Sequence, residues 1–199
     1  MKAHFFTILT CIMLLCSFST FSSPFDFGKI SDEQMDLDYY QKKYPGAPAV
    51  VIGDIADSRF VYNNSSDRFQ FQMFRQTRIM ILSEAGLDYG DVPIPYYQSH
   101  DGKEEISKFK GYVYNLEGKK TNRIKVSYRE ANTNELGNNW KEMIIPFPSV
   151  KVGSVIELRY EITSDYLFNM RSWFFQREIP VEYSEYQVNL PSFFNYLAR

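Results

Sequence analysis

From about residue 49 onward, apolar and polar residues alternate along the chain with a period of two. The clearest run is residues 155–163, whose two faces carry different side chains: Ile156, Leu158, Tyr160 and Ile162 against Glu157, Arg159 and Glu161. Strict alternation predicts a strand with one buried face, and sheets that leave the other face in water are usually antiparallel. We therefore expect Glu157 and Glu161 to be solvated, together with Glu142 in a further predicted strand.

A longer strand is predicted over residues 69–81. Its two faces again differ, with Phe69, Phe71, Met73, Thr77, Ile79 and Ile81 on one side and Gln70, Gln72, Gln76 and Arg78 on the other. Arg75 falls on the apolar face, which predicts a bend or a β-bulge at that position. Further strands are expected at residues 109–116, 141–147 and 186–190.

Two local signals precede these strands. Ser31-Asp32-Glu33-Gln34 has the form of a capping box, so we expect a short helix that continues to about Tyr40. Residues 49–52 and 59–62 indicate a hairpin with its turn at Asp57-Ser58. Many short strands, little helix and no linker favour one all-β, mainly antiparallel domain, built as a β-sandwich.

The first 22 residues have the three parts of a secretory signal peptide. Lys2 provides the positive charge, an apolar stretch follows, and Thr20 and Ser22 give the small-x-small pattern of a cleavage site. We expect cleavage between Ser22 and Ser23. A transmembrane anchor is the alternative, but the apolar run is shorter than the roughly 20 residues that a spanning helix needs.

The two cysteines, Cys11 and Cys16, both lie in this signal. Lipid attachment at Cys16 is an alternative, although the preceding Leu15 is larger than usual for a lipidation site. Residues 23–199 contain no thiol, so we expect no disulfide, no thiolate nucleophile and no cysteine-ligated zinc in the mature chain. An exported domain of this kind depends on an ordinary apolar core, for which roughly 175 residues are sufficient.

Charge argues against nucleic-acid binding. Without Lys2, 21 of the 22 basic residues remain against 24 acidic ones, a net charge of −3, and the two signs are interleaved. Nucleic-acid binding depends on clustered lysine and arginine, and the longest basic run is Lys119-Lys120. We expect neither a nucleic-acid partner nor a cofactor.

Residue types that support catalysis are scarce. After the signal, His100 is the only histidine, and it lies in a polar, turn-like stretch that ends in Asp101-Gly102. A serine triad would need this histidine as its base, but an exposed loop residue is the simpler interpretation. Glu104 and Glu105 could form a carboxylate pair for sugar hydrolysis. Neighbours in a strand point to opposite faces, however, so the two would not share a substrate. We expect no metal site.

Aromatic residues provide a candidate binding surface. Four of them could form a platform for a sugar or a peptide: Trp140, Trp173, Tyr96 and Tyr97. The competing interpretation is that aromatic residues of a β-rich domain fill the core or pair across strands. Both interpretations remain open at this point.

Several segments, in order, are similar to one known family. The most recognisable is Phe147-Pro148-Ser149-Val150-Lys151-Val152-Gly153-Ser154-Val155-Ile156-Glu157, followed by Tyr160. Other matching segments are Ala47-Pro48-Ala49-Val50-Val51, Tyr112-Val113-Tyr114-Asn115-Leu116, Asn139-Trp140-Lys141-Glu142, Trp173-Phe174-Phe175-Gln176, Ile179-Pro180-Val181 and Ser184-Glu185-Tyr186. From about Phe27 to the last residue, the chain resembles the domain of unknown function 3857 family (DUF3857).

The resemblance implies an exported protein of Bacteroidetes-type bacteria, in which an immunoglobulin-like β-sandwich precedes a transglutaminase-like domain with a Cys-His-Asp triad. We expect that domain to be absent here, in which case its catalytic residues have no counterpart, and we expect the sandwich at residues 23–199 to be incomplete at its C-terminal end. The resemblance favours a non-catalytic accessory or interaction module of the periplasm, cell envelope or medium. Its expected partner is a transglutaminase-like domain, or a peptide or glycan of the envelope.

Two alternatives to this accessory role remain. One is a carbohydrate- or peptide-binding module of the cell envelope, which would use the aromatic platform. The other is an autonomous carboxylate hydrolase, which would use Glu104 or Glu105.

Overall fold

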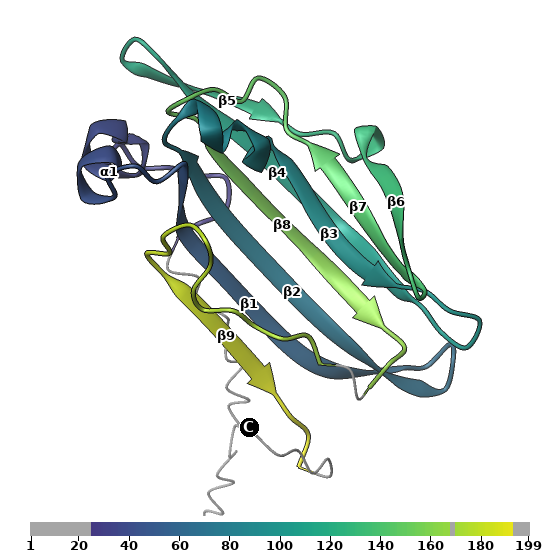
Figure 1. The fold of residues 1–199 in the computed structure, drawn as a ribbon. Helices are drawn as coiled ribbons and strands as arrows, with labels where there is room; N and C mark the ends of the chain where they lie inside the picture. The colour runs from purple at the N-terminus through teal and green to yellow at the C-terminus, as the bar shows by residue number, and fades with distance from the viewer. Residues whose placement is uncertain (1–24, 168–169, 193–199) are drawn as a thin grey trace, which may run out of the picture.

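The computed structural model describes residues 25–167 and 170–192 (Figure 1). The predicted signal peptide at residues 1–22, its cleavage site between Ser22 and Ser23, and both cysteines lie outside the described residues. The last residues, 193–199, where the sandwich was expected to be incomplete, also lie outside them. None of the helices in the described part of the chain has the length and apolar character that crossing a membrane requires.

Strands in the described residues form two sheets (Figure 1). The larger has the order β5-β4-β8-β2-β1-β9, with β1 Ala49–Asn63, β2 Arg68–Ile81, β4 Glu104–Glu117, β5 Lys120–Lys125, β8 Val155–Ser164 and β9 Ser184–Asn189. The smaller has the order β3-β7-β6, with β3 Asp91–Tyr97, β7 Trp140–Pro146 and β6 Asn132–Gly137. All neighbouring strands are antiparallel except β1 and β9, which are parallel.

Among residues 25–167 and 170–192, helical structure is limited to short elements: η1 Glu33–Met35, α1 Leu37–Lys43, η2 Glu84–Gly90 and η3 Tyr128–Glu130. The predicted all-β, mainly antiparallel fold with a short N-terminal helix is confirmed. The two sheets are unequal, with six strands facing three, whereas a constant-type immunoglobulin domain pairs four strands with three.

The N-terminal helix differs from the prediction in its limits. The capping box forms, since the Ser31 N–H donates to Gln34 Oε1 at 3.3 Å and the Gln34 N–H donates to Ser31 Oγ at 3.4 Å. It leads into the short η1, however, and α1 has its own cap, because the Asp36 carboxylate accepts from the Tyr39 N–H at 2.9 Å. The α-helix therefore begins after Asp36 and continues past Tyr40 to Lys43.

The predicted hairpin turn at Asp57-Ser58 is wrong. Both residues lie inside the continuous strand β1, which pairs with β2 on one side and β9 on the other. The reversal occurs at residues 64–67, where Asp67 adopts a positive φ of 52°. The polar residues of β1 resembled a turn signal, but Ser58 is fully buried, which a turn residue on the surface would not be.

The predicted bulge at Arg75 is also wrong. β2 pairs with β8 in unbroken register from Phe71 to Met80. Register shifts occur instead in β1, between Val51 and Gly53, and in β4, between Ser107 and Lys110. Arg75 stays on the interior face, where it forms hydrogen bonds with the Asp54 carboxylate.

The side of the six-stranded sheet that faces away from the smaller sheet is not solvated as predicted. Glu157 is completely buried, and Glu161 is 6% exposed, whereas Glu142 on β7 is partly exposed. Residues 25–30 cross this face, and Phe25 packs so closely on β1 that a Cβ at Gly53 would come within 2.1 Å of its ring. The N-terminal segment thus covers what the alternation alone marked as a wet surface.

A buried ion pair lies beneath the N-terminal segment. Arg78 and Glu157 are side by side on β2 and β8, and both side chains are 0% exposed. Arg78 also donates to the Lys29 carbonyl at 2.7 Å, and Glu157 accepts from the Gly28 N–H at 2.9 Å and the Tyr114 hydroxyl at 2.8 Å. The segment therefore satisfies charges that the sheet itself carries.

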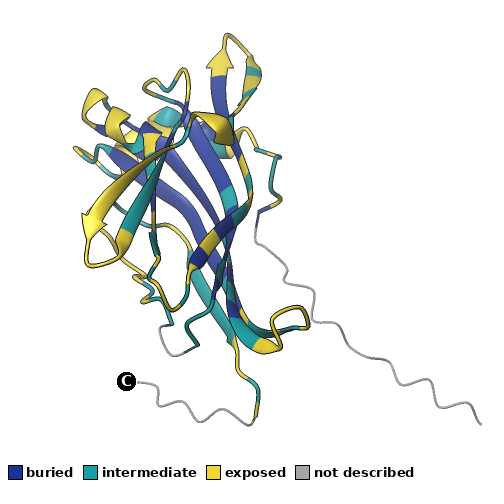
Figure 2. Cartoon of the chain, turned by 90° about the vertical axis from the view of Figure 1, so that its right-hand side faces the viewer, coloured by how far each residue is buried: buried dark blue, intermediate teal, exposed yellow. Residues whose placement is uncertain are grey.

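Two apolar clusters lie on opposite faces of this sheet. The larger fills the space between the sheets, with Val51, Phe71, Ile94, Ile145 and Ile156 among its members. The smaller packs η1 and α1 on the other face, through Met35, Tyr40, Val50, Met80 and Val155. Burial is concentrated in the central strands, whereas β6 is exposed along its whole length (Figure 2).

Residues 170–182, here called the crossover segment, connect β8 to β9 and run back over the larger sheet (Figure 1). Two hydrogen bonds attach the segment to Val51 of β1. The Val51 N–H donates to the Pro180 carbonyl, and the Val51 carbonyl accepts from the Glu182 N–H, both at 2.9 Å. Buried Ile179 joins the main core. The segment therefore covers the interior face near β1, beside the region that the three-stranded sheet covers.

Replacing Arg78 by methionine should lower the free energy of unfolding by roughly 3–5 kcal/mol, because Glu157 would remain buried without a countercharge. Urea denaturation followed by circular dichroism would measure the loss. Arg159→Met is the matched control, since that arginine contacts the N-terminal segment through the Phe27 ring at 4.3 Å. Its expected cost is below about 1 kcal/mol, and equal losses for the two variants would contradict the prediction.

Candidate functional site

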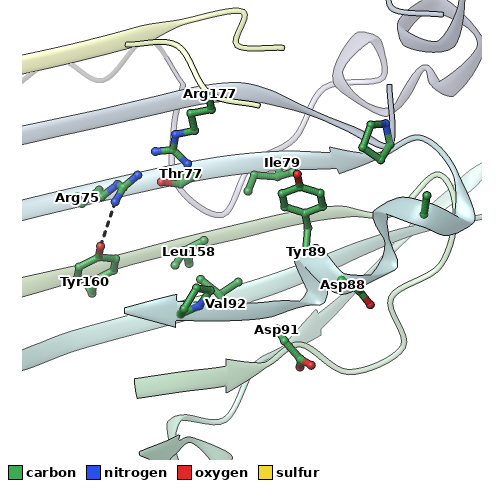
Figure 3. A pocket seen from close by; sticks show the side chains of 13 residues that line it. Arg75, Thr77, Ile79, Asp88, Tyr89, Asp91, Val92, Leu158, Tyr160 and Arg177 are labelled. Carbon is green, nitrogen blue, oxygen red and sulfur yellow. Dashed lines mark hydrogen bonds between the residues drawn. The ribbon is translucent and has the colours of Figure 1, made fainter. Parts of the chain in front are cut away.

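A half-open cavity of about 530 Å³ lies on the interior face of the larger sheet. Its floor is formed by β2 and β8, one wall by η2 and β3, and the other wall by the crossover segment (Figure 3). The cavity exists because the smaller sheet and the crossover segment each cover only part of this face. Its volume is in the range of pockets that bind small molecules.

Asp54 of β1 organises one end of this cavity. Its carboxylate is 1% exposed and accepts from Arg75 Nε and Nη2, both at 2.8 Å, and from Thr77 Oγ1 at 2.6 Å. A further hydrogen bond comes from Nη2 of Arg177, on the crossover segment. One carboxylate thus joins β1, β2 and the crossover segment.

Burial by itself would raise the pKa of Asp54, but the nearby Arg75 and Arg177 guanidinium groups hold it below its usual value. The pKa of Arg177 is lowered, first by burial and then by the positive charge of Arg75. Two guanidinium groups face a single carboxylate, so the cluster of Asp54, Arg75 and Arg177 carries one net positive charge. Glu178, the next residue after Arg177, places a negative charge near Tyr89, which lines the same cavity.

Arg75 makes several contacts, and its side chain is 24% exposed. Besides Asp54, it donates to the Tyr160 hydroxyl at 3.5 Å (dashed line in Figure 3). Its guanidinium also lies 5.0 Å from the centre of the Trp173 ring. Arg177 has fewer contacts, and its side chain is 29% exposed. Arg177 is therefore the more available of the two cations.

The other end of the cavity has a different character. Ile79, Leu158 and Val92 form an apolar middle section, and beyond them Asp88 and Asp91 lie on the rim, at the start of β3 (Figure 3). Both aspartates are exposed. The cavity therefore has a cationic end, an apolar middle and an acidic rim.

The free edge of β3 borders the cavity and offers no N–H group to a further strand. Gly90 and Gln98 hydrogen-bond on the β7 side, so by alternation the backbone of residues 91, 93, 95 and 97 faces away from β7. Pro93 and Pro95 have no N–H, the Asp91 N–H donates to Asp88, and the Tyr97 N–H donates to Glu104 at 2.8 Å. Edge prolines of this kind block strand pairing.

A second cavity of about 520 Å³ lies at the far end of β3. Tyr97 packs edge-on against Trp140 and against Tyr166, at centroid distances of 5.4 and 5.2 Å. Glu104 and Arg171 also line this cavity and are joined by a 2.5 Å hydrogen bond. Trp140 is 41% exposed, so its ring is accessible.

The four predicted platform residues therefore do not form a single surface. Tyr97 and Trp140 line the second cavity, whereas Tyr96, their neighbour, packs against the main core. Trp173 stacks on Tyr186 of β9 at 5.2 Å and donates its indole N–H to Ser184 Oγ at 3.0 Å. The core interpretation holds for Tyr96 and Trp173, and an accessible position holds for Tyr97 and Trp140.

His100 and the pair Glu104 and Glu105 lie as the sequence indicated. His100 is exposed, in the turn region between β3 and β4. Glu104 is 6% exposed whereas Glu105 is exposed, so the two carboxylates lie on opposite faces of β4. Within residues 25–167 and 170–192, no group of three or more potential metal-ligating side chains comes together.

Sequence analysis missed Asp54, Arg75 and Arg177 as site residues. One signal was present, because Arg75 interrupts the apolar face of its strand, but it was taken as a sign of irregular backbone. Arg177 follows Phe174-Phe175-Gln176 in a stretch without alternation. Nothing in its local pattern indicated contact with Asp54, which precedes it by 123 residues.

Replacing Asp54 by asparagine should reduce the free energy of unfolding at pH 7 by roughly 3–5 kcal/mol, because two partly buried guanidinium groups lose their countercharge. Chemical denaturation of the purified variant would measure this. Asp57→Asn, also on β1, is the control, since Asp57 accepts a hydrogen bond from the neutral, exposed Asn189 at 2.9 Å instead of from an arginine. Similar losses for Asp54→Asn and Asp57→Asn would be inconsistent with the central role of Asp54.

The same substitution has a predicted pH dependence. Because the folded-state pKa of Asp54 is lowered from 3.8, its contribution is complete above that unfolded value and is lost as the pH falls through the lower folded value. The stability difference between the natural protein and Asp54→Asn should therefore be constant from pH 7 to about pH 5. It should shrink below pH 3.8, and a difference that shrinks above pH 5 would show that another group is responsible.

Comparison with known proteins places this fold in a family. No curated protein matches the chain. A crystal structure from Parabacteroides distasonis ATCC 8503, described as a "putative protease", aligns over 59% of this chain at 15% identity and a TM-score of 0.47. The chain covers 23% of that longer protein. The model of a domain of unknown function with solved structure, DUF3857, matches residues 67–198, which is well over half of the 199 residues, so this chain belongs to the DUF3857 family.

Proposed function

We propose that this chain is a non-catalytic interaction module of an exported, transglutaminase-like protein, and that it holds a peptide segment of the cell envelope. The observation that carries the proposal is the cavity beside β3, which has a cationic end and an apolar middle but no catalytic arrangement. His100, the only histidine among the described residues, lies on an exposed turn, and Glu104 and Glu105 lie on opposite faces of β4.

The form of the cavity supports binding through side chains. Because the β3 edge lacks available N–H groups, a peptide beside it would not extend the sheet as a further strand. It would instead depend on Arg177 and on the apolar section around Ile79 and Leu158.

The second cavity favours one alternative, a carbohydrate-binding module. Trp140 is accessible and packs against Tyr97, and Glu104 and Arg171 provide polar groups at the same place. Aromatic faces with nearby hydrogen-bonding groups are suited to sugar rings. The two proposals therefore use different cavities and can be separated by blocking one at a time.

Partly filling the first cavity should weaken peptide binding. Ala85 is exposed on η2 and lines this cavity, so Ala85→Trp adds bulk without altering the core. Ser172→Trp is the matched control at the second cavity. Fluorescence anisotropy would use a random decapeptide library labelled at its N-terminus, with a free C-terminus. We expect Ala85→Trp to weaken binding at least about tenfold, a loss of about 1.4 kcal/mol, and Ser172→Trp to leave it unchanged.

The reverse result, with binding lost only in Ser172→Trp, would favour the second cavity. Absence of peptide binding by the natural protein would reject the proposed function. The chain by itself should neither hydrolyse nor cross-link casein, and measurable turnover would show that it is an enzyme.

Export predicts a mature N-terminus at Ser23. Phe25, the first residue that the structure describes, is 8% exposed, and its carbonyl accepts from Gln76 at 3.3 Å. Cleavage before Ser23 would therefore keep the N-terminal segment that covers the sheet. N-terminal sequencing of the protein from its own cell envelope would identify the first residue. A protein that retains Met1 would contradict export with cleavage.

A further inference from the structure

We infer that the cavity beside β3 recognises a ligand with a single carboxylate on an apolar body, as at the free C-terminus of a peptide. This inference rests on the proposed function and makes it more specific, because it names the group that is bound. The carboxylate would lie against Arg177, and the apolar body would cover Ile79, Leu158 and Val92.

The balance of charge is the first argument. Each oxygen of Asp54 already accepts two hydrogen bonds, one set from Arg75 and Thr77 and the other from Arg75 and Arg177. Its hydrogen-bond acceptors are therefore all used, and its single negative charge does not neutralise both guanidinium groups. A bound carboxylate would supply the missing negative charge in a place that is partly shielded from water.

The geometry of Arg177 is the second argument. Its Nη2 donates to Asp54, which leaves Nε and Nη1 as further donors on the same guanidinium group. A guanidinium group presents its donors as a rigid fork that matches a carboxylate in a bidentate arrangement. With a side chain that is 29% exposed, Arg177 can reach both Asp54 and a ligand. Arg75 is less suited to this role, because its Nε, Nη1 and Nη2 already donate to Asp54 or Tyr160.

The rest of the cavity restricts the ligand further. Asp88 and Asp91 on the opposite rim (Figure 3) would repel a second negative charge, which disfavours phosphate and polyanions. An acetate ion is too small to cover the apolar middle section, which would stay in contact with water. A ligand with an aliphatic side chain would cover this section. Because β3 offers no N–H group, a peptide would be recognised by its end instead of by its backbone.

The test compares two ligands of nearly the same shape, N-acetyl-leucine and N-acetyl-leucinamide, which differ in the charge at the carboxyl end. Titration of the ¹⁵N-labelled protein, observed by NMR, should show shifts at Tyr89 and Val92 with the acid. We expect the amide to bind at least about tenfold more weakly. Inorganic phosphate should produce no saturable shifts at these two residues.

Variants then assign the effect to Arg177. Arg177→Gln should remove the preference for the acid, and Arg177→Lys should restore part of it, because lysine keeps the charge but not the fork. Arg129→Gln is the control for net charge, since Arg129 is exposed on η3, away from the residues that line the cavity. It should keep the preference unchanged. The comparison of the two ligands on the natural protein needs no variant, so it stands even if Arg177→Gln fails to fold.

Equal binding of acid and amide would overturn the inference, as would tight binding of phosphate. The decapeptide library with amidated C-termini separates this failure from failure of the proposed function. If amidated and free peptides bind alike and Ala85→Trp blocks both, the peptide-binding function stands and the carboxylate inference falls. If neither set binds, both fall.

Discussion

The contact on which the rest of the site depends is that of Asp54 with two arginines. A buried carboxylate requires a countercharge, and here Arg75 comes from the neighbouring strand whereas Arg177 comes from the crossover segment. The same contact fixes the crossover segment to the interior face of the larger sheet, and it leaves one positive charge in excess. The position of the cavity wall and the charge of the cavity therefore have one cause.

The charged groups on the two faces of the larger sheet differ in how far they are enclosed. Arg78 and Glu157 form a pair that is completely enclosed by the N-terminal segment, so they contribute to the specificity and stability of the fold. Asp54 and its arginines lie beside an open cavity and are only partly shielded. A closed pair suits a structural role, whereas an unequal, accessible cluster suits ligand binding.

This difference connects the fold to the proposed function. The family match, DUF3857, states no activity, and the described residues form two cavities on the interior side of the larger sheet and at the far end of β3. The cavity beside β3 combines excess positive charge, an apolar section and a protected strand edge. These are the properties on which the proposed binding of a peptide end rests.

The sequence by itself determined the all-β class, the cores of most strands, the capping box, the family, and the exposed position of His100. Those features follow from local periodicity and from residue type. Only the tertiary structure decided that Glu157 is buried, that β1 is continuous through Asp57-Ser58, and that Arg177 meets Asp54. Alternation indicates which side chains share a face, but what covers that face depends on segments far away in the sequence. Polar residues inside a strand can be mistaken for a turn until the partners that satisfy their charges and hydrogen bonds are in place.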